Sequence, residues 1–107
     1  MKDIRFCGRS LDVLRGFPAG AKREAGYQLD RIQRGLEPTD WKPMPSIGSG
    51  VREIRIMERE QYRVIYVAKF ADAVYVLHAF QKKTQKTRKQ DIDAAKQAFK
   101  KLLTRYE

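Results

Sequence analysis

Basic side chains are concentrated in the segment 78–90, HAFQKKTQKTRKQ, which overlaps the end of an apolar run. No acidic residue lies between Asp72 and Asp91, so neighbours in the sequence do not neutralise these charges. Clustered Lys and Arg side chains are typical of surfaces that bind phosphate groups or acidic proteins. The segment is therefore either a polyanion-binding site or an ordinary solvated loop.

Two arginines in the preceding strands extend this positive charge. Because side chains alternate across a strand, Arg55 shares a face with Glu53, while Ile54 points to the other face. Arg63 lies within the apolar sequence YRVIY. A charge there is costly to bury unless it is paired or the face is open to solvent. An open, phosphate-binding face would explain both arginines.

We expect one face of the sheet to gather these charges into a basic patch. Arginine suits phosphate binding because it is permanently charged and donates two parallel hydrogen bonds. The alternative is that Arg55 pairs with Glu58, Arg63 pairs with Glu60, and the lysines are merely solvated. The expected members of the patch are Arg55, Arg63 and Lys82 or Lys83, with Tyr66 or His78 nearby.

Other chemistries find less support. Cys7 and His78 are far apart in the sequence, and we expect Cys7 to be buried and inert in the first strand. The GSG sequence at 48–50 precedes a strand and not a helix, so we interpret it as a turn and not as a phosphate loop. One Cys and one His do not supply the ligands of a zinc-type site. We therefore expect no metal and no cofactor.

Length and composition favour a single domain over residues 1–107. The chain is 42% hydrophobic and 34% charged, with a formal net charge of +10. Residues 81–107 carry nine Lys or Arg and three Asp or Glu, so most of the net charge lies in the last quarter. No apolar run approaches the roughly 20 residues that span a bilayer, and the first residues lack the apolar segment of a signal peptide. We expect a cytoplasmic protein without a membrane segment.

The pattern of apolar residues predicts an α+β domain with the order β-α-α-β-β-β-α. Residues 3–8 alternate as a short strand, 11–15 form a helical turn, and a longer helix begins near Pro18 and ends at Gly35. Residues 37–50 predict an ordered connector anchored by Trp41. VREIRIM, YRVIYVAKF and AVYVLHAF predict an antiparallel meander, whose last strand is apolar enough to be interior. A final helix begins near Lys89.

Three of these motifs, VREIR, YRVIY and HAFQKKTQKT, together carry a resemblance that extends over roughly residues 4–104. The chain resembles the RelE/HigB-like toxins of bacterial toxin–antitoxin modules. It is most similar to their phage-derived branch, whose members end the last strand in a similar LHxFxKKTxKT signature. Relatives often have Pro after the KT pair, where this chain has Arg88, which adds charge to the loop.

The resemblance implies an endoribonuclease that cuts messenger RNA, usually on the ribosome, and that a cognate antitoxin protein silences. RNA supplies its own 2′-hydroxyl nucleophile, so such an enzyme needs to orient the backbone and stabilise charge on the phosphate. Matched by motif, Arg63 is expected to hold the phosphate, and Lys82 or Lys83 to stabilise charge or transfer a proton. His78 and Tyr66 are candidate acids or bases, with Tyr106 a more distant one. The residues expected to bind RNA are Arg52, Arg55, Tyr66, Lys86, Arg88 and Lys89.

The sequence leaves two other functions open. ParE-like toxins share this fold and inhibit DNA gyrase without cutting RNA, although they generally lack the basic residues on the sheet face. A non-catalytic RNA-binding protein would use the same basic face to bind phosphate and nothing more. Transcript cleavage on translating ribosomes separates the expected ribonuclease from both alternatives.

Overall fold

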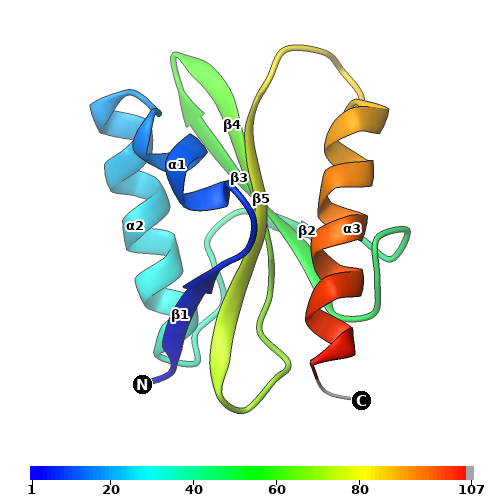
Figure 1. The fold of residues 1–107 in the computed structure, drawn as a ribbon. Coiled ribbons are helices and arrows are strands. Elements are labelled where there is room, and N and C mark those ends of the chain that lie inside the picture. The colour runs from blue at the N-terminus through cyan, green and yellow to red at the C-terminus, as the bar shows by residue number, and fades with distance from the viewer. Residues whose placement is uncertain (106–107) are drawn as a thin grey trace.

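The computed structural model describes residues 1–105, which form five strands and three helices (Figure 1). The α+β class expected from the sequence is confirmed. The observed order has one additional element, because the connector between the second helix and the meander contains a short strand, β2. The elements are β1 (Asp3–Phe6), α1 (Ser10–Arg15), α2 (Ala19–Gln33), β2 (Trp41–Pro43), β3 (Val51–Glu58), β4 (Glu60–Val67), β5 (Ala73–Lys82) and α3 (Lys89–Thr104).

The strands form one sheet in the order β1-β5-β4-β3-β2. β1 pairs with β5 in parallel, and the other neighbouring strands are antiparallel. The meander of β3, β4 and β5 is therefore as expected. β5 lies in the interior of the sheet, which explains why it is apolar on nearly every position.

Helices cover both faces of the sheet: α1 and α2 lie on one side and α3 on the other (Figure 1). The first core contains the stripe of Ala21, Ala25, Leu29 and Ile32 on α2. The second core contains Ala95, Phe99 and Leu102 of α3. Within residues 1–105, no helix combines the length and apolar character that crossing a membrane requires.

An irregularity in β5 determines which side chains reach the face covered by α3. Ile65 of β4 pairs with His78, but the next residue, Tyr66, pairs with Val76, so Leu77 has no partner in the register. Such a bulge shifts the alternation of side chains by one residue. Beyond the bulge, three residues of β5 therefore point to the same face as Arg63: His78, Phe80 and Lys82. Without the bulge they would point to the opposite face.

Candidate functional site

The expected basic patch forms on the α3 side of the sheet, at the end of the meander where β5 leaves it. Arg63 on β4 lies between Arg55 on β3 and Phe80 on β5. Lys82 pairs with Gln61, two residues before Arg63. Paired residues of neighbouring strands point to the same face. Arg55, Arg63 and Lys82 are thus brought together, although they are far apart in the sequence.

A buried carboxylate lies at the centre of this patch. Glu53 of β3 is fully buried (0% exposed), and its Oε1 lies 3.4 Å from Nε of Arg63 and 3.8 Å from Nζ of Lys42. Thr87, in the loop before α3, donates a hydrogen bond from Oγ1 to its Oε2 at 3.4 Å. Sequence reasoning placed Glu53 on this face but gave it no role, and it did not consider Lys42. Lys42 and Glu53 are brought together by the β2–β3 register, which is known only from the structure.

Arg63 is almost fully buried, yet its guanidinium lies at the edge of the patch. Nη2 donates to Oε1 of Gln61 at 2.7 Å, and Nη1 donates to the main-chain oxygen of Tyr62 at 3.1 Å. Nε faces Glu53 without forming a hydrogen bond. Burial lowers the pKa of Arg63, while Glu53 opposes that change. The guanidinium remains charged, because arginine does not deprotonate in proteins.

Arg55 is exposed and pairs with Asp40, and not with Glu58, the partner that the alternative interpretation of the sequence gave it. Its Nη2 lies 2.8 Å from Oδ1 of Asp40, and its Nε donates to the same oxygen at 2.9 Å. The main-chain N–H of Arg55 also donates to the main-chain oxygen of Asp40 at 2.9 Å. Asp40 precedes β2, so this contact depends on the added strand. An anion that binds Arg55 must compete with this surface carboxylate.

Lys82 has the altered acidity expected of a group near several cations. Burial lowers its pKa, Arg63 lowers it further, and Lys42 and Arg55 add smaller contributions, whereas Glu53 raises it. A lysine with a lowered pKa is a better proton acceptor near neutral pH than a free lysine. We define the cationic cluster as Lys42, Arg55, Arg63 and Lys82.

Two shallow pockets give access to the cationic cluster. One, of about 320 Å³, is lined by Asp40, Arg55 and Arg63 among others. The other, of about 440 Å³, is lined by Lys82 and Lys83 at the start of the following loop. Gln61 lines both pockets and separates them. A phosphate entering beside Gln61 would therefore meet the arginines on one side and the lysines on the other.

His78 shares the face of the cationic cluster but has a structural partner. Its Nε2 lies 2.8 Å from Oδ1 of Asp91 in the first turn of α3, and its ring stacks on Phe80 with centroids 5.5 Å apart. An ionised carboxylate only accepts hydrogen bonds, so Nε2 carries the hydrogen. This contact joins β5 to α3. The role of His78 as an acid or base stays a prediction.

Tyr66 and Arg52 do not lie on this face, and the expectation that Tyr66 is near Arg63 is wrong. Arg52 of β3 and Tyr66 of β4 pair with each other on the α2 side of the sheet. Each is separated from the arginine of its own strand, Arg55 or Arg63, by an odd number of positions, so it points to the opposite face. Tyr66 is 1% exposed, and burial raises its pKa, which Arg52 partly offsets. Arg52 stacks over Trp41 at 4.0 Å and lies 3.6 Å from Oε1 of Glu37.

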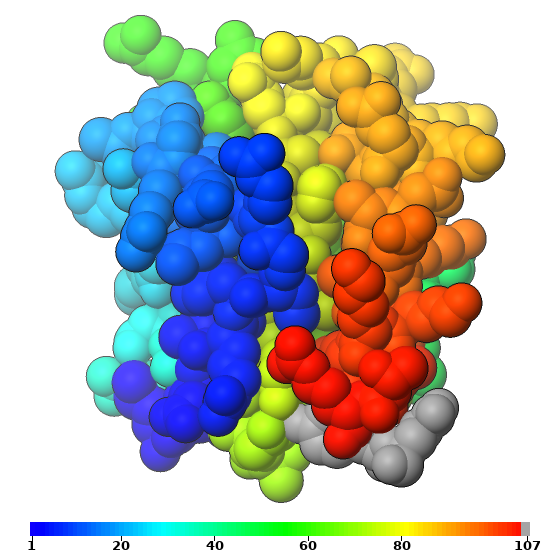
Figure 2. Space-filling model, in the orientation of Figure 1, coloured from blue at the N-terminus to red at the C-terminus, as the bar shows by residue number. Residues whose placement is uncertain are grey.

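The remaining predicted RNA-binding residues lie in and after the loop that joins β5 to α3, at one end of the molecule (Figures 1 and 2). Lys83, Lys86, Arg88 and Lys89 are all exposed there. None of them forms an ion pair within residues 1–105. Tyr106 lies outside the described residues. The loop therefore continues the positive surface of the cationic cluster without local neutralisation.

This arrangement is suited to binding a phosphate and stabilising additional negative charge on it. Arg63 and Lys42 lie beside buried Glu53, and Arg55 and Lys82 add positive charge on the same face. Low-dielectric surroundings strengthen the effect of a buried cation such as Arg63 on a bound anion. In the part of the chain that the structure describes, no three His, Cys, Asp or Glu side chains lie together as potential metal ligands. The chemistry available from the chain's own residues is thus that of arginine, lysine and a buried glutamate.

Comparison with protein families places this site in a known context. Residues 12–100 match the family described as phage derived protein Gp49-like (DUF891). The match includes every member of the cationic cluster and the loop that follows β5. No curated protein matches the chain. The chain belongs to the Gp49-like family of phage-derived proteins, which is part of the RelE/HigB toxin group.

Proposed function

We propose that this protein is the toxin of a toxin–antitoxin module and that it cuts messenger RNA, on the ribosome, without a metal ion. The observation that carries the proposal is the cationic cluster around buried Glu53, in a chain of the RelE/HigB toxin group. A solvated loop would not need cations fixed on four strands, two of them paired with a buried carboxylate. The proposed site of action is the cytoplasm, where ribosomes and transcripts are found.

In the proposed reaction, the ribose 2′-hydroxyl attacks the adjacent phosphorus. The bond from phosphorus to the 5′-oxygen of the next nucleotide breaks, which leaves a 2′,3′-cyclic phosphate and a 5′-hydroxyl. Negative charge increases on the non-bridging oxygens during this step. Arg63 stabilises that charge after its Nη2 exchanges the amide oxygen of Gln61 for a phosphate oxygen. Glu53 holds the guanidinium in place from the buried side.

Proton transfer is assigned to the lysines at the end of β5. Burial and the neighbouring Arg63 lower the pKa of Lys82, so Lys82 is assigned as the acceptor of the proton of the 2′-hydroxyl. The departing 5′-oxygen takes a proton from a protonated neighbour, for which exposed Lys83 and half-buried His78 are the candidates. Arg55, Lys86, Arg88 and Lys89 bind the flanking phosphates and ribosomal RNA. Tyr66 and Arg52, on the opposite face, are left out of the proposed site.

The test is to map cleavage sites on one messenger RNA in a purified translation system. The wild type is compared with Arg63→Lys, which keeps the charge but loses the forked donor geometry, and with Arg63→Ala and Lys82→Ala. Lys22→Ala and Arg23→Ala on α2 are matched exposed controls. We expect cuts with the wild type and the controls, a loss of about 100-fold or more in both Arg63 variants, and a comparable loss in Lys82→Ala.

Folding of each variant is checked by circular dichroism, because Arg63→Ala leaves Glu53 without its nearest cation. Equal cleavage by folded Arg63→Ala and wild type would remove Arg63 from the mechanism, and equal cleavage by Arg63→Lys would show that the charge suffices without the forked geometry. Intact RNA with the wild type would reject the ribonuclease itself, and inhibition of DNA gyrase would then be measured as the alternative toxic activity.

A further inference from the structure

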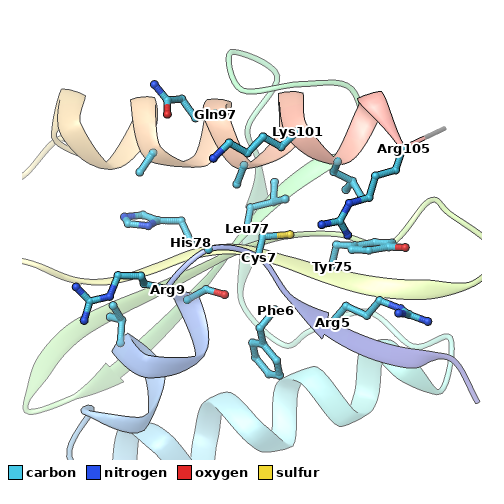
Figure 3. A pocket seen from close by; sticks show the side chains of 16 residues that line it. Arg5, Phe6, Cys7, Arg9, Tyr75, Leu77, His78, Gln97, Lys101 and Arg105 are labelled. Carbon is cyan, nitrogen blue, oxygen red and sulfur yellow. The ribbon is translucent and has the colours of Figure 1, made fainter. Parts of the chain in front are cut away.

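A further recess lies between β1–α1 and α3, and it is lined by no member of the cationic cluster (Figure 3). Its volume is about 390 Å³. Figure 2 shows it as a hollow between the N-terminal segment and the last helix, with β5 at its base. We call it the β1–α3 groove.

The base of the groove is apolar because small and aliphatic side chains face it. Leu77 and Leu102 form the base, together with Ala98, whereas the ring of Phe6 points away from the groove toward α2 (Figure 3). Ala94 and Ala98 keep α3 thin on this side, so that the helix does not fill the groove. Val13 of α1, 37% exposed, adds an apolar edge. Such a surface can receive a few apolar side chains of a partner.

The rim of the groove is strongly positive. Arg5 and Arg9 lie on one wall, and Lys101 and Arg105 lie on the other (Figure 3). Among residues 1–105, no Asp or Glu lines the groove, all four cations are exposed, and none of them forms an ion pair. Several arginines elsewhere on this protein's surface do have carboxylate partners, as Arg34, Arg52 and Arg55 show. Within the described residues, the groove therefore lacks the negative charge that balances other parts of the surface.

We infer that the β1–α3 groove binds an acidic, amphipathic segment of a partner protein. Apolar side chains of that segment occupy the base, and its carboxylates pair with the four cations of the rim. RNA fits less well, because single-stranded bases need exposed aromatic faces for stacking. The aromatic side chains of the lining do not offer such faces, because Tyr75 is buried, Phe6 packs against the core on the other side of the sheet and His78 stacks on Phe80. The inference concerns binding alone and does not depend on ribonuclease activity.

Binding in the groove would place the partner next to the proposed site without covering all of it. His78 lines the groove and also lies on the same face of β5 as Phe80 and Lys82. It is joined to Asp91 at the start of α3. A partner in the groove therefore contacts the strand that carries Lys82, while the pockets beside Gln61 stay outside the groove lining.

Cys7 provides a direct probe, since it is the only cysteine of the chain and it lines the groove. The ligand is a synthetic helical peptide with leucines on one face and glutamates on both flanks. The rate at which a disulfide reagent modifies Cys7 is measured with and without this peptide. Its affinity is measured by fluorescence anisotropy. Oligouridylate of matched length and a peptide with Gln in place of Glu are tested in parallel.

We expect the acidic peptide to protect Cys7 and the Gln peptide to bind about tenfold more weakly. Lys101→Ala/Arg105→Ala should weaken binding by about tenfold, and so should Ala94→Glu, which adds a negative charge to an exposed position of the wall. Lys96→Ala/Lys100→Ala removes the same charge from α3 outside the groove and should change affinity less than about twofold.

Three results would overturn the inference. The first is protection of Cys7 by oligouridylate and not by the peptide, which would assign the groove to RNA. The second is equal loss of binding in the two double variants, which would mean that only overall charge matters. The third is peptide binding without protection of Cys7, which would place the peptide elsewhere on the surface.

Discussion

At the scale of single residues, Glu53 explains how several cations are held together on one sheet face. Burying a carboxylate is costly unless cations and hydrogen-bond donors surround it. Arg63, Lys42 and Thr87 provide that environment, from β4, β2 and the loop before α3. The carboxylate thus fixes three segments of the chain relative to one another. Its removal should affect stability as well as the site.

We expect Glu53→Gln to lower the free energy of unfolding by about 3 kcal/mol, since it leaves Arg63 without its buried counter-charge. The amide preserves the shape of the side chain, so the loss reports charge and not packing. Urea unfolding monitored by tryptophan fluorescence measures it. Glu58→Gln, at the exposed end of the same strand, is the control and should cost less than about 0.5 kcal/mol. Similar losses in both variants would contradict the assigned role.

Lys82 gives a prediction of pH dependence. Its pKa in the folded protein lies below 10.5, the value for an unperturbed lysine, because burial and then Arg63 disfavour the charged form. Between the folded pKa and 10.5 the unfolded chain binds more protons, so this group's contribution to the free energy of unfolding rises with pH. Lys82→Met should therefore stabilise the protein near neutral pH, and its advantage should shrink as pH approaches 10.5.

The measurement compares urea unfolding of Lys82→Met and wild type across that pH range. Lys83→Met, which removes one charge from the exposed neighbouring position, is the matched control. A difference between Lys82→Met and wild type that stays constant with pH would show that Lys82 has no lowered pKa in the folded protein.

At the scale of elements, the loop between β2 and β3 determines how closely α3 can approach the sheet. A Cβ atom on Gly48 would overlap the ring of Phe99, which belongs to the second core. Gly48→Ala should therefore displace the ring and lower the free energy of unfolding by about 1–3 kcal/mol. Thermal unfolding measures the effect. No change in stability would mean that the loop moves aside freely.

Gly26→Ala is the matched control for this substitution. Gly26 lies in the exposed interior of α2, and its added Cβ would meet nothing within 4 Å. Alanine favours a helix over glycine by about 0.8–1 kcal/mol. The same chemical change should thus stabilise the protein at position 26 and destabilise it at position 48.

The sequence predicts the elements that repeat a clear period and misses those that depend on tertiary pairing. The strands β3, β4 and β5 and the helices α2 and α3 are confirmed, because the apolar residues of each repeat with a regular period over several residues. β2 was missed because it has three residues, one of them Pro43, and shows no alternation. The Lys42–Glu53 contact was missed with it, since it depends on β2–β3 pairing.

The bulge at Leu77 escaped prediction for a related reason. β5 is apolar on both faces, so a shift of one residue leaves no mark in its hydrophobic pattern. The shift nevertheless places His78, Phe80 and Lys82 on the face of Arg63. Tyr66 lies on the other face for a simpler reason: it is three residues after Arg63 on the same strand, so the alternation of side chains already excluded it from the patch.

At the scale of the whole molecule, the net charge of +10 should make RNA binding strongly dependent on salt. The loop that continues the cationic cluster is expected to supply several phosphate contacts. Lys86→Gln/Arg88→Gln/Lys89→Gln should reduce the slope of log affinity against log salt concentration by about 2, since each single-strand contact adds about 0.7. Filter binding to a single-stranded RNA across a salt series measures the slope.

The control carries the same loss of charge on the opposite side of the sheet, as Arg15→Gln/Lys22→Gln/Arg23→Gln on α1 and α2. Its slope should stay close to that of the wild type. Equal slopes for the two triple variants would show that the RNA does not distinguish the loop from the rest of the basic surface.

The walls of the β1–α3 groove come from opposite ends of the chain: Arg5 and Arg9 from the beginning, Lys101 and Arg105 from the end. During synthesis β1 emerges long before both β5, its pairing partner, and α3. The groove therefore does not exist until α3 has been made and has packed on the sheet. A ligand of the groove would thus distinguish the folded domain from fragments and from chains that stall before α3.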